Sequence, residues 1–265
     1  MKMKLKEGRS KVITLSYDDG VFQDIRLVEI MGRYGIKGTF NLNSGCYFPE
    51  DKVREAPRGR LKRSEAAELF IDSGHEVAVH SYTHPRLEKM DTTEMLSEII
   101  EDRKDIESCY GTVARGMAYP FGTYDGRVID VLKNCGIVYS RTVRTTESFN
   151  FPEDWLELHP TCHHNNPRLM ELIKRFVEVP NRYGYAEMFY LWGHSYEFDD
   201  NNNWEVIERF CEYAGGRDDI WYATNIEIYY YVKAYESLQT SYDKKLVHTP
   251  RLSTSGLRAE ARCIA

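Results

Sequence analysis

The sequence lacks the segments with which a chain enters or crosses a membrane. No run of about 18 apolar residues occurs, so no membrane-spanning helix is expected. The first ten residues carry charge but lack the apolar stretch that a signal peptide needs. We therefore expect a cytoplasmic protein that acts without a membrane.

Paired cysteines and an excess of basic charge are missing as well. The six cysteines are scattered without a C-x-x-C pair, so reduced and inert thiols are expected. Lys and Arg together number 35 against 41 Asp and Glu, and this balance argues against a nucleic-acid-binding protein. Low-complexity tracts are also missing, and the composition is that of a globular protein.

The sequence does contain short apolar runs that alternate with helical patterns. The β-branched run Val12–Tyr17 predicts a buried strand, and further strands are predicted at 38–42, 76–79, 117–119, 137–143, 155–159, 188–192 and 220–223. Helices are predicted at 23–34, 64–73, 91–109, 127–134, 167–179, 203–214 and 224–238. This alternation implies an α/β fold, most economically a distorted (β/α) barrel of seven or eight mostly parallel strands.

The barrel is expected to form one domain over residues 1–240. Residues 241–265 are expected to be a C-terminal extension that is disordered, packs as an edge or derives from the expression vector. Within the barrel, Ser64 is the expected cap of its helix. Capping boxes are expected where Asp91 precedes Glu94 and where Thr224 precedes Glu227.

Carboxylates and imidazoles cluster where predicted strands end. Asp18 and Asp19 follow the first strand, His80 and His84 the third, and His194 the strand at 188–192. Asp-Asp-Gly alone is also ordinary turn chemistry. The carboxyl ends of parallel strands share one rim, however, so we expect these side chains to meet there. A helical turn would let the two histidines converge on one metal ion.

A long loop over residues 43–62 carries five basic residues. Loops of this length in compact domains are often lids or binding loops. Two interpretations stay open, a loop whose charge meets an anionic substrate and a loop that is merely solvated.

Four segments of the chain resemble motifs of one family, the polysaccharide deacetylases (the NodB-homology, carbohydrate esterase family 4 group). Ser16–Gly20 is similar to the first motif, T-F-D-D-G, and His80–Pro85 resembles the H-[ST]-x-x-H-P motif. Ala118–Gly122 is similar to the third motif, R-P-P-Y-G, and Leu191–His194 to the late L-x-x-H motif. The resemblance covers about 12–230 and implies the barrel fold of that family.

The resemblance also implies roles for individual residues. It makes Asp18 the general base, His194 the general acid and the backbone N–H of Phe121 an oxyanion-hole donor. The implied metal ligands are Asp19, His80 and His84. Such a set leaves open positions on a divalent ion, for which zinc is expected and cobalt, nickel or iron are alternatives. Further candidates for substrate contact are Tyr82, Tyr119 and Arg141.

The chain departs from the family pattern in two places. Ala118 stands where the third motif begins with an arginine that orients the catalytic aspartate. Either Arg141 or Arg144 replaces that arginine, or Asp18 works with a different pKa. The fourth motif, an aspartate with a tryptophan that supports the late histidine, has no convincing match. Three histidines are candidates for part of that function, although surface positions are equally compatible with their loop: His159, His163 and His164.

The implied activity is metal-dependent hydrolysis of an N-acetyl group on an acetylated sugar or a related small amide. A soluble substrate is favoured over a cell-wall polymer because no signal peptide is seen in this sequence. Two alternatives stay open, an allantoinase-like hydrolase of a non-sugar C–N bond and a non-catalytic carbohydrate-binding relative. The oligomeric state is not predicted.

Overall fold

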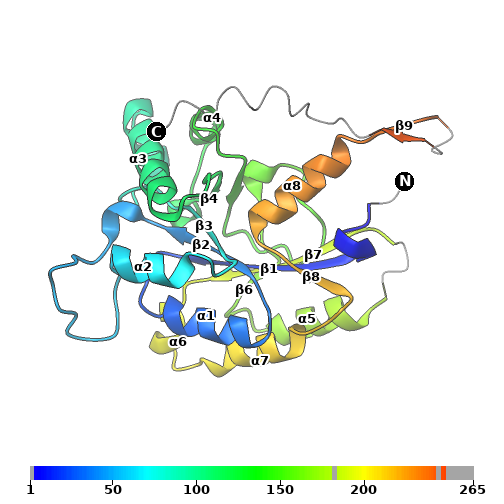
Figure 1. Ribbon diagram of the computed structural model, residues 1–265, viewed down its shortest axis with the longest axis horizontal. Helices are drawn as coiled ribbons and strands as arrows, with labels where there is room; N and C mark the ends of the chain where they lie inside the picture. Colours follow the sequence, from blue (N-terminus) through cyan, green and yellow to red (C-terminus); the bar gives the residue numbers. More distant parts are fainter. Residues whose placement is uncertain (1–2, 181–183, 243–245, 249–265) are drawn as a thin grey trace. The chain divides into compact units, whose positions relative to one another are not determined.

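The computed structural model describes residues 3–180, 184–242 and 246–248 (Figure 1). Contacts divide the described chain into two compact units, one up to Tyr229 and one from Tyr230 onward. The second unit includes a short antiparallel pair, β9 (Gln239–Thr240) with β10 (Val247–His248). Residues 249–265 lie outside the described residues, and the domain boundary near residue 240 stays a prediction. Within the described residues, no helix combines the length and apolar character that a bilayer crossing needs.

The first unit is built on one parallel sheet. Its strands are β1 (Lys11–Asp18), β2 (Gly38–Leu42), β3 (Glu76–Val79), β4 (Gly116–Ala118), β5 (Tyr139–Arg141), β6 (Cys162–His163), β7 (Glu187–Gly193) and β8 (Ile220–Tyr222). Their order is β5-β4-β3-β2-β1-β7-β6, and β8 also pairs with β1. Every pairing in this sheet is parallel. The predicted barrel-like α/β fold is confirmed as a curled, partly closed sheet covered by helices.

Strand β1 is the centre of the sheet and is buried along its whole length. Strand β7 pairs with residues 11–17, while β8 pairs with residues 11–13 and β2 with residues 15–18. Because a strand has two edges, β2 and β8 share the edge opposite β7. Helices lie on both sides of the sheet, and all eight residues of β1 are buried, as the composition of this apolar run predicts.

The segment that leads into β6 brings the two ends of the sheet together. Leu158 pairs with Arg141 of β5, and four residues later Cys162 pairs with Leu191 of β7. The strand predicted at 155–159 is wrong, because Trp155–Glu157 is a 3-10 turn whose first N–H groups are held by Asp154. The strand lies at β6 instead, and its two residues are too few to form a recognisable apolar run.

Helices connect the strands and cover the sheet. They are α1 (Asp24–Arg33), α2 (Arg63–Phe70), α3 (Thr92–Tyr110), α4 (Gly126–Asn134), α5 (Leu169–Glu178), α6 (Tyr196–Asp200), α7 (Glu205–Ala214) and α8 (Asn225–Glu236). In Figure 1, α1, α5 and α7 lie together on one side of the strands, and α3 and α4 lie together on the other. Helix α6 has five residues and escapes sequence patterns.

The predicted capping boxes are confirmed, but the predicted Ser64 cap is wrong. The Glu94 carboxylate accepts from the N–H of Asp91 at 3.0 Å, and that of Glu227 from the N–H of Thr224 at 2.9 Å. Helix α2 already begins at Arg63, after a turn in which Glu65 accepts from the N–H of Lys62 at 2.8 Å. The Ser64 hydroxyl donates to Glu50 instead.

Candidate active site

A cavity of about 420 Å³ opens at the carboxyl ends of the strands. The residues that line it come from the loops after β1, β3, β4, β5 and β7: Asp18, Asp19, His80, His84, Tyr119, Phe121, Gly122, Val143, Trp192, His194 and Tyr196. The structure therefore places the polar clusters of the sequence at one rim, as the parallel topology requires.

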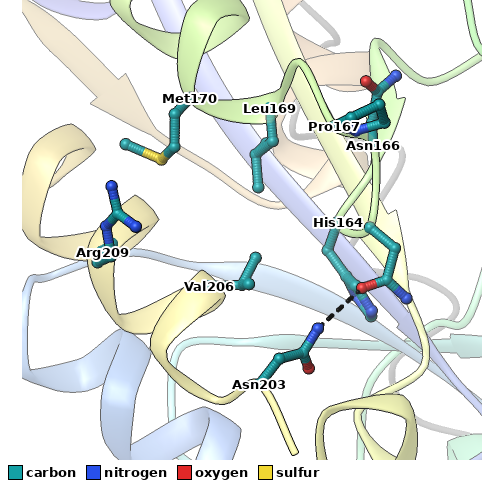
Figure 2. Close-up of a pocket in the computed structure, with 9 residues that line it drawn as sticks. His164, Asn166, Pro167, Leu169, Met170, Asn203, Val206 and Arg209 are labelled. Atoms are coloured by element: carbon teal, nitrogen blue, oxygen red, sulfur yellow. Dashed lines mark hydrogen bonds between the residues drawn. The ribbon is translucent and has the colours of Figure 1, made fainter. Parts of the chain in front are cut away.

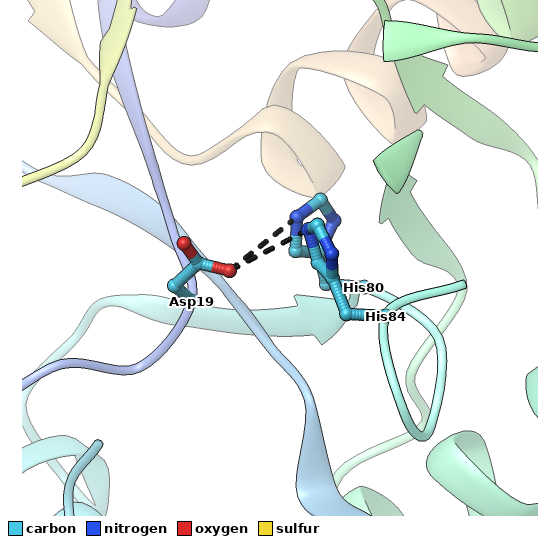
Figure 3. A group of neighbouring side chains, drawn as sticks. All are labelled: Asp19, His80 and His84. Atoms are coloured by element: carbon cyan, nitrogen blue, oxygen red, sulfur yellow. Dashed lines mark ion pairs between the residues drawn. The ribbon is translucent and has the colours of Figure 1, made fainter. Parts of the chain in front are cut away.

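Three of these side chains present ligand atoms to one another (Figure 3). Oδ1 of Asp19 lies 3.6 Å from Nε2 of His84 and 3.9 Å from Nε2 of His80. Nδ1 of His80 lies 2.8 Å from the carbonyl oxygen of Ala118, which only accepts, so the proton is on Nδ1 and the Nε2 lone pair faces Asp19. Burial lowers the pKa of His80 to about 4, which keeps the imidazole neutral. Two neutral imidazoles and a carboxylate fit a divalent transition metal.

The expected helical turn between His80 and His84 is wrong. Ser81 and His84 have positive φ angles of 64° and 62°, and the segment forms bends rather than a helix. Asp19, at the end of β1, also has a positive φ of 85°. These backbone conformations are strained for L-residues, and they turn all three side chains toward a common point.

The basic loop contributes Arg60 to this cluster. Its guanidinium Nη1 lies 2.9 Å from Oδ1 of Asp19, donates to the Asp19 carbonyl oxygen and lies 2.9 Å from Oδ1 of Asn43. The N–H of Phe22 donates to the Gly59 carbonyl oxygen at 2.8 Å, which ties the end of the loop to the chain after β1. Part of the loop's charge is therefore directed at a predicted metal ligand.

Asp18 is buried, with 2% of its surface exposed, and its carboxylate has fixed partners. The guanidinium of Arg141, itself 1% exposed, pairs with Oδ2, and the Asn41 amide donates to Oδ1 at 2.9 Å. Burial would raise the pKa of Asp18, but the positive charge of Arg141 and the nearby imidazoles hold this pKa below its ordinary value. Asp18 is therefore a carboxylate at neutral pH.

The structure decides between the two candidate arginines in favour of Arg141. In the β4–β5 register, Ala118 and Arg141 are direct cross-strand partners. The guanidinium of Arg141 therefore reaches Asp18 from β5, the strand next to the one on which the motif would carry its arginine. Arg141 also stacks on Trp192, with the guanidinium carbon 4.4 Å from the ring centroid. Arg144 lies beside His159 in the lining of a separate cavity.

His194 lies across the cavity from the predicted metal ligands. Its Nε2 is 3.8 Å from Oδ2 of Asp18, and its Nδ1 is 3.3 Å from Oε1 of Glu197 on α6. Burial opposes a charge on the ring, but the Glu197 and Asp18 carboxylates raise the pKa of His194 above its ordinary value. Sequence reasoning missed Glu197, although its position three residues after His194 is a signal for a side chain that reaches back.

The remaining candidates for substrate contact are Tyr119 and Phe121, which line the cavity, and Tyr82. Tyr119 lines it but is 1% exposed and donates its hydroxyl to the Leu156 carbonyl oxygen. Phe121 has a positive φ of 58° and an exposed ring. Tyr82 is not among the described residues that line the cavity. The oxyanion and substrate roles of these residues stay predictions.

The three candidate histidines separate into two places. Nδ1 of His159 lies 2.7 Å from the Thr142 hydroxyl, away from the predicted metal ligands. His163 and His164 both contact Oε2 of Glu197, with Nε2 at 3.1 Å and 2.9 Å. These two histidines thus support the carboxylate beside His194.

The fold and the site define a parallel (β/α) barrel with carboxylates and imidazoles gathered at its carboxyl rim. A sequence profile described as Polysaccharide deacetylase matches residues 5–140. The chain belongs to the polysaccharide deacetylase family.

Two curated relatives match the first part of the chain. The peptidoglycan N-acetylglucosamine deacetylase PgdA of Listeria monocytogenes is 27% identical over 127 residues, which cover 47% of this chain and 24% of the relative. Chitin deacetylase 1 of Cryptococcus neoformans is 26% identical over 147 residues, which cover 53% of this chain and 28% of the relative. The matched segment thus spans about a quarter of the length of these relatives.

Two solved structures share the fold. A Mycobacterium smegmatis protein provisionally described as a polysaccharide deacetylase has a TM-score of 0.61 at 15% identity, covering 95% of this chain and 98% of that chain. A Bacillus anthracis protein described as a carbohydrate esterase family 4 pseudoenzyme has a TM-score of 0.50 at 16% identity, covering 84% and 66%. The fold alone therefore does not decide whether a chain is active.

Proposed function

We propose that this protein is a metal-dependent hydrolase that removes the N-acetyl group from an acetylated sugar or a related small amide. The observation that carries the proposal is the convergence of five side chains on one cavity: Asp18, Asp19, His80, His84 and His194. The names of the curated relatives, a peptidoglycan N-acetylglucosamine deacetylase and a chitin deacetylase, support an acetylated carbohydrate as the substrate class.

Asp19, His80 and His84 would hold the metal, with zinc as the first expectation and cobalt, nickel or iron as alternatives. When bound, the ion would supply Lewis acidity toward water and the amide carbonyl. The neutral state of His80 and the proton on its Nδ1 leave Nε2 available as a ligand atom.

The protein's own groups would move the protons. Asp18, kept ionised by Arg141, would take a proton from the attacking water as the general base. His194 faces the same cavity through Nε2 and would protonate the leaving amine. The N–H of Phe121 remains the proposed donor to the carbonyl oxygen as it gains charge.

The first experiment measures metal content and acetate release together. Protein purified without chelator or affinity metal is expected to contain about one equivalent of transition metal and to release acetate from N-acetylglucosamine oligosaccharides. His80→Ala, which removes a ligand, is expected to lose both. Protein that stays free of metal when zinc is supplied would contradict the proposed function.

The two alternatives predict other results in the same assay. A hydrolase of a non-sugar C–N bond would bind metal and leave acetylated sugars intact while cleaving a cyclic amide such as allantoin. A non-catalytic relative, comparable to the Bacillus anthracis pseudoenzyme, would bind sugar without turnover. The soluble substrate and the cytoplasmic location stay predictions.

A further inference from the structure

Glu197 stands at the centre of a polar cluster behind the candidate general acid. Its Oε1 is 3.3 Å from Nδ1 of His194, and its Oε2 is 3.1 Å from Nε2 of His163 and 2.9 Å from Nε2 of His164. One carboxylate therefore has an imidazole on one oxygen and two imidazoles on the other. Four ionisable side chains meet at this point, two from the end of β6 and two from the segment that runs from β7 into α6.

The backbone around β7 determines this arrangement. Strand β7 ends at Gly193, and the N–H of Glu197 donates to the His194 carbonyl oxygen at 3.1 Å, so the carboxylate folds back under the His194 ring. The hydroxyl of Ser195, between them, donates to the buried Asp24 on α1 at 2.6 Å. This turn is tied to a neighbouring helix, so the distance between Glu197 and His194 is a property of the fold.

His164 is fixed from several sides. Its N–H donates to the Trp192 carbonyl oxygen at 2.9 Å, and its ring stacks on Phe198 with centroids 4.2 Å apart. A Cβ on Gly193 would lie 2.0 Å from Nδ1 of His164, so the ring needs the glycine there. The other side of His164 borders a cavity of about 250 Å³, where Asn203 donates to Asn165 (Figure 2).

The hydrogen bond that His163 accepts favours protons over a metal ion at this cluster. The backbone N–H of Asn165 donates to Nδ1 of His163 at 3.1 Å, so the ring proton of the neutral imidazole is on Nε2, facing Glu197. A metal would need the Nε2 lone pair, which this tautomer does not offer. The cluster thus differs from that of Asp19, where Nδ1 of His80 faces a carbonyl oxygen and leaves Nε2 free.

The imidazoles around Glu197 keep its carboxylate negatively charged. Burial works against ionisation, but the three imidazoles of His163, His164 and His194 around the carboxylate hold the pKa of Glu197 below its ordinary range. A carboxylate oxygen can only accept, so the 3.3 Å contact favours a proton on Nδ1 of His194. Nε2 is the nitrogen that faces Asp18 in the cavity, and it carries a second proton when the ring acts as an acid.

We propose that Glu197 is the positioning residue for His194: it faces Nδ1, sets the ring orientation and favours the doubly protonated ring, whose Nε2–H is presented to the cavity, and His163 and His164 hold Glu197 for this purpose. The proposal rests on the proposed function, because the orientation matters for a His194 that exchanges a proton with substrate. It assigns the support of the late histidine to a carboxylate three residues after it and to two histidines at the end of β6.

Glu197→Gln tests the proposal without removing the side-chain volume. His163 and His164 offer N–H donors, so the amide oxygen of the new side chain would turn to them and its NH₂ group would face Nδ1 of His194. An NH₂ group cannot accept from Nδ1–H, so the doubly protonated ring loses its partner and the neutral ring, which has one proton fewer to give, is favoured. We expect kcat to fall at least about 100-fold with KM changed less than about threefold, because general acid catalysis contributes 10²–10⁴-fold.

Two further variants complete the set. Glu197→Asp keeps a carboxylate and is expected to recover at least tenfold of the lost kcat, on the order of 1.4 kcal/mol. Asp200→Asn removes an exposed carboxylate from the same helix and is expected to leave kcat and KM unchanged. Circular dichroism melting serves as the check that each variant is folded.

The readout that does not need turnover is the protonation of His194, followed against pH by long-range ¹H–¹⁵N correlation on the zinc-loaded protein. We expect the doubly protonated ring to persist to higher pH in the wild type than in Glu197→Gln. An unchanged titration or an unchanged kcat in folded Glu197→Gln overturns the proposal, as does a second equivalent of bound zinc that this variant loses. A wild type that releases no acetate refutes the proposed function, whereas the titration still decides the role of Glu197.

Discussion

Individual residues of the site have acquired partners from distant parts of the chain. Arg141 pairs with Asp18 across 123 positions, and Arg60 reaches Asp19 across 41. We expect Arg141 to take the role of the arginine of the family's third motif, since Ala118 and Arg141 are in register. A guanidinium then lies beside the buried carboxylate although its position in the sequence has changed.

The replacement can be tested by moving the arginine back. Arg141→Ala leaves a buried carboxylate without its counterion, so the pKa of Asp18 is expected to rise and kcat to fall about 100-fold. Adding Ala118→Arg to Arg141→Ala is expected to restore at least tenfold. Steady-state acetate release measures both, with Arg144→Ala as the control whose kcat is expected to stay unchanged. No recovery in the double variant would show that the two positions are not equivalent.

Arg60 is expected to tune the affinity of the predicted metal ligand set. Its guanidinium orients Asp19 through both the carboxylate and the carbonyl oxygen, and loss of such outer contacts typically costs 10–100-fold in metal affinity. Arg60→Ala should therefore weaken zinc binding by a factor in this range, measured by competition with a chelating dye. Arg58→Ala, an exposed arginine of the same loop, is the matched control. Equal affinity in the two variants would contradict the assignment.

At the scale of elements, β6 and β7 pack closely at Gly193, where there is no room for a side chain. Gly193→Ala would bring a Cβ to 2.0 Å from Nδ1 of His164, so the buried ring must move. We expect a loss of about 1–3 kcal/mol in the free energy of unfolding, as for other overpacked sites, measured by denaturant titration. Gly32→Ala in α1, where nothing lies within 4 Å of the added Cβ, is the control and is expected to stabilise by about 0.5–1 kcal/mol.

The entry to β3 is expected to make stability depend on pH. His75 accepts a hydrogen bond from the N–H of Gly38 at 3.1 Å, and burial lowers its pKa from the ordinary 6.5 to about 4. Below pH 6.5 the unfolded chain binds a proton that the folded chain does not, so stability falls as the pH drops toward 4. Between pH 7 and pH 5 this one group accounts for a loss of about 2 kcal/mol.

Comparison with His75→Asn isolates this contribution, because the amide keeps an acceptor and does not titrate. Urea unfolding at pH 7 and at pH 5 should show a smaller pH-dependent loss for the variant than for the wild type. Other buried histidines, including His80 and His164, titrate in both proteins and cancel in the difference. An identical loss in both proteins would refute the role of His75.

For the whole molecule, metal binding and stability are expected to be coupled. The ligands come from the ends of β1 and β3, so the complete set exists only in the folded chain. A ligand at 100 times its Kd then stabilises the fold by about 2.7 kcal/mol. Thermal unfolding with zinc and with excess chelator should differ accordingly for the wild type, and His80→Ala should show no difference. A wild type whose unfolding ignores zinc would argue against this site.

The sequence by itself determined the parallel α/β architecture and most residues of the rim. The apolar run of β1, the alternation of strands with helices and the motif residues from Asp18 to His194 carry this information locally, because strand burial and turn chemistry depend on neighbouring residues. The parallel topology then brings the motif residues to one edge.

Only the tertiary structure decided which side chains support the rim residues. The choice of Arg141 over Arg144 depends on the β4–β5 register, and the grouping of Glu197 with His163 and His164 depends on the pairing of β6 with β7. These contacts join segments far apart in the chain. The charge of a side chain is visible in the sequence, but its partner is selected by distances that exist only after the sheet has formed.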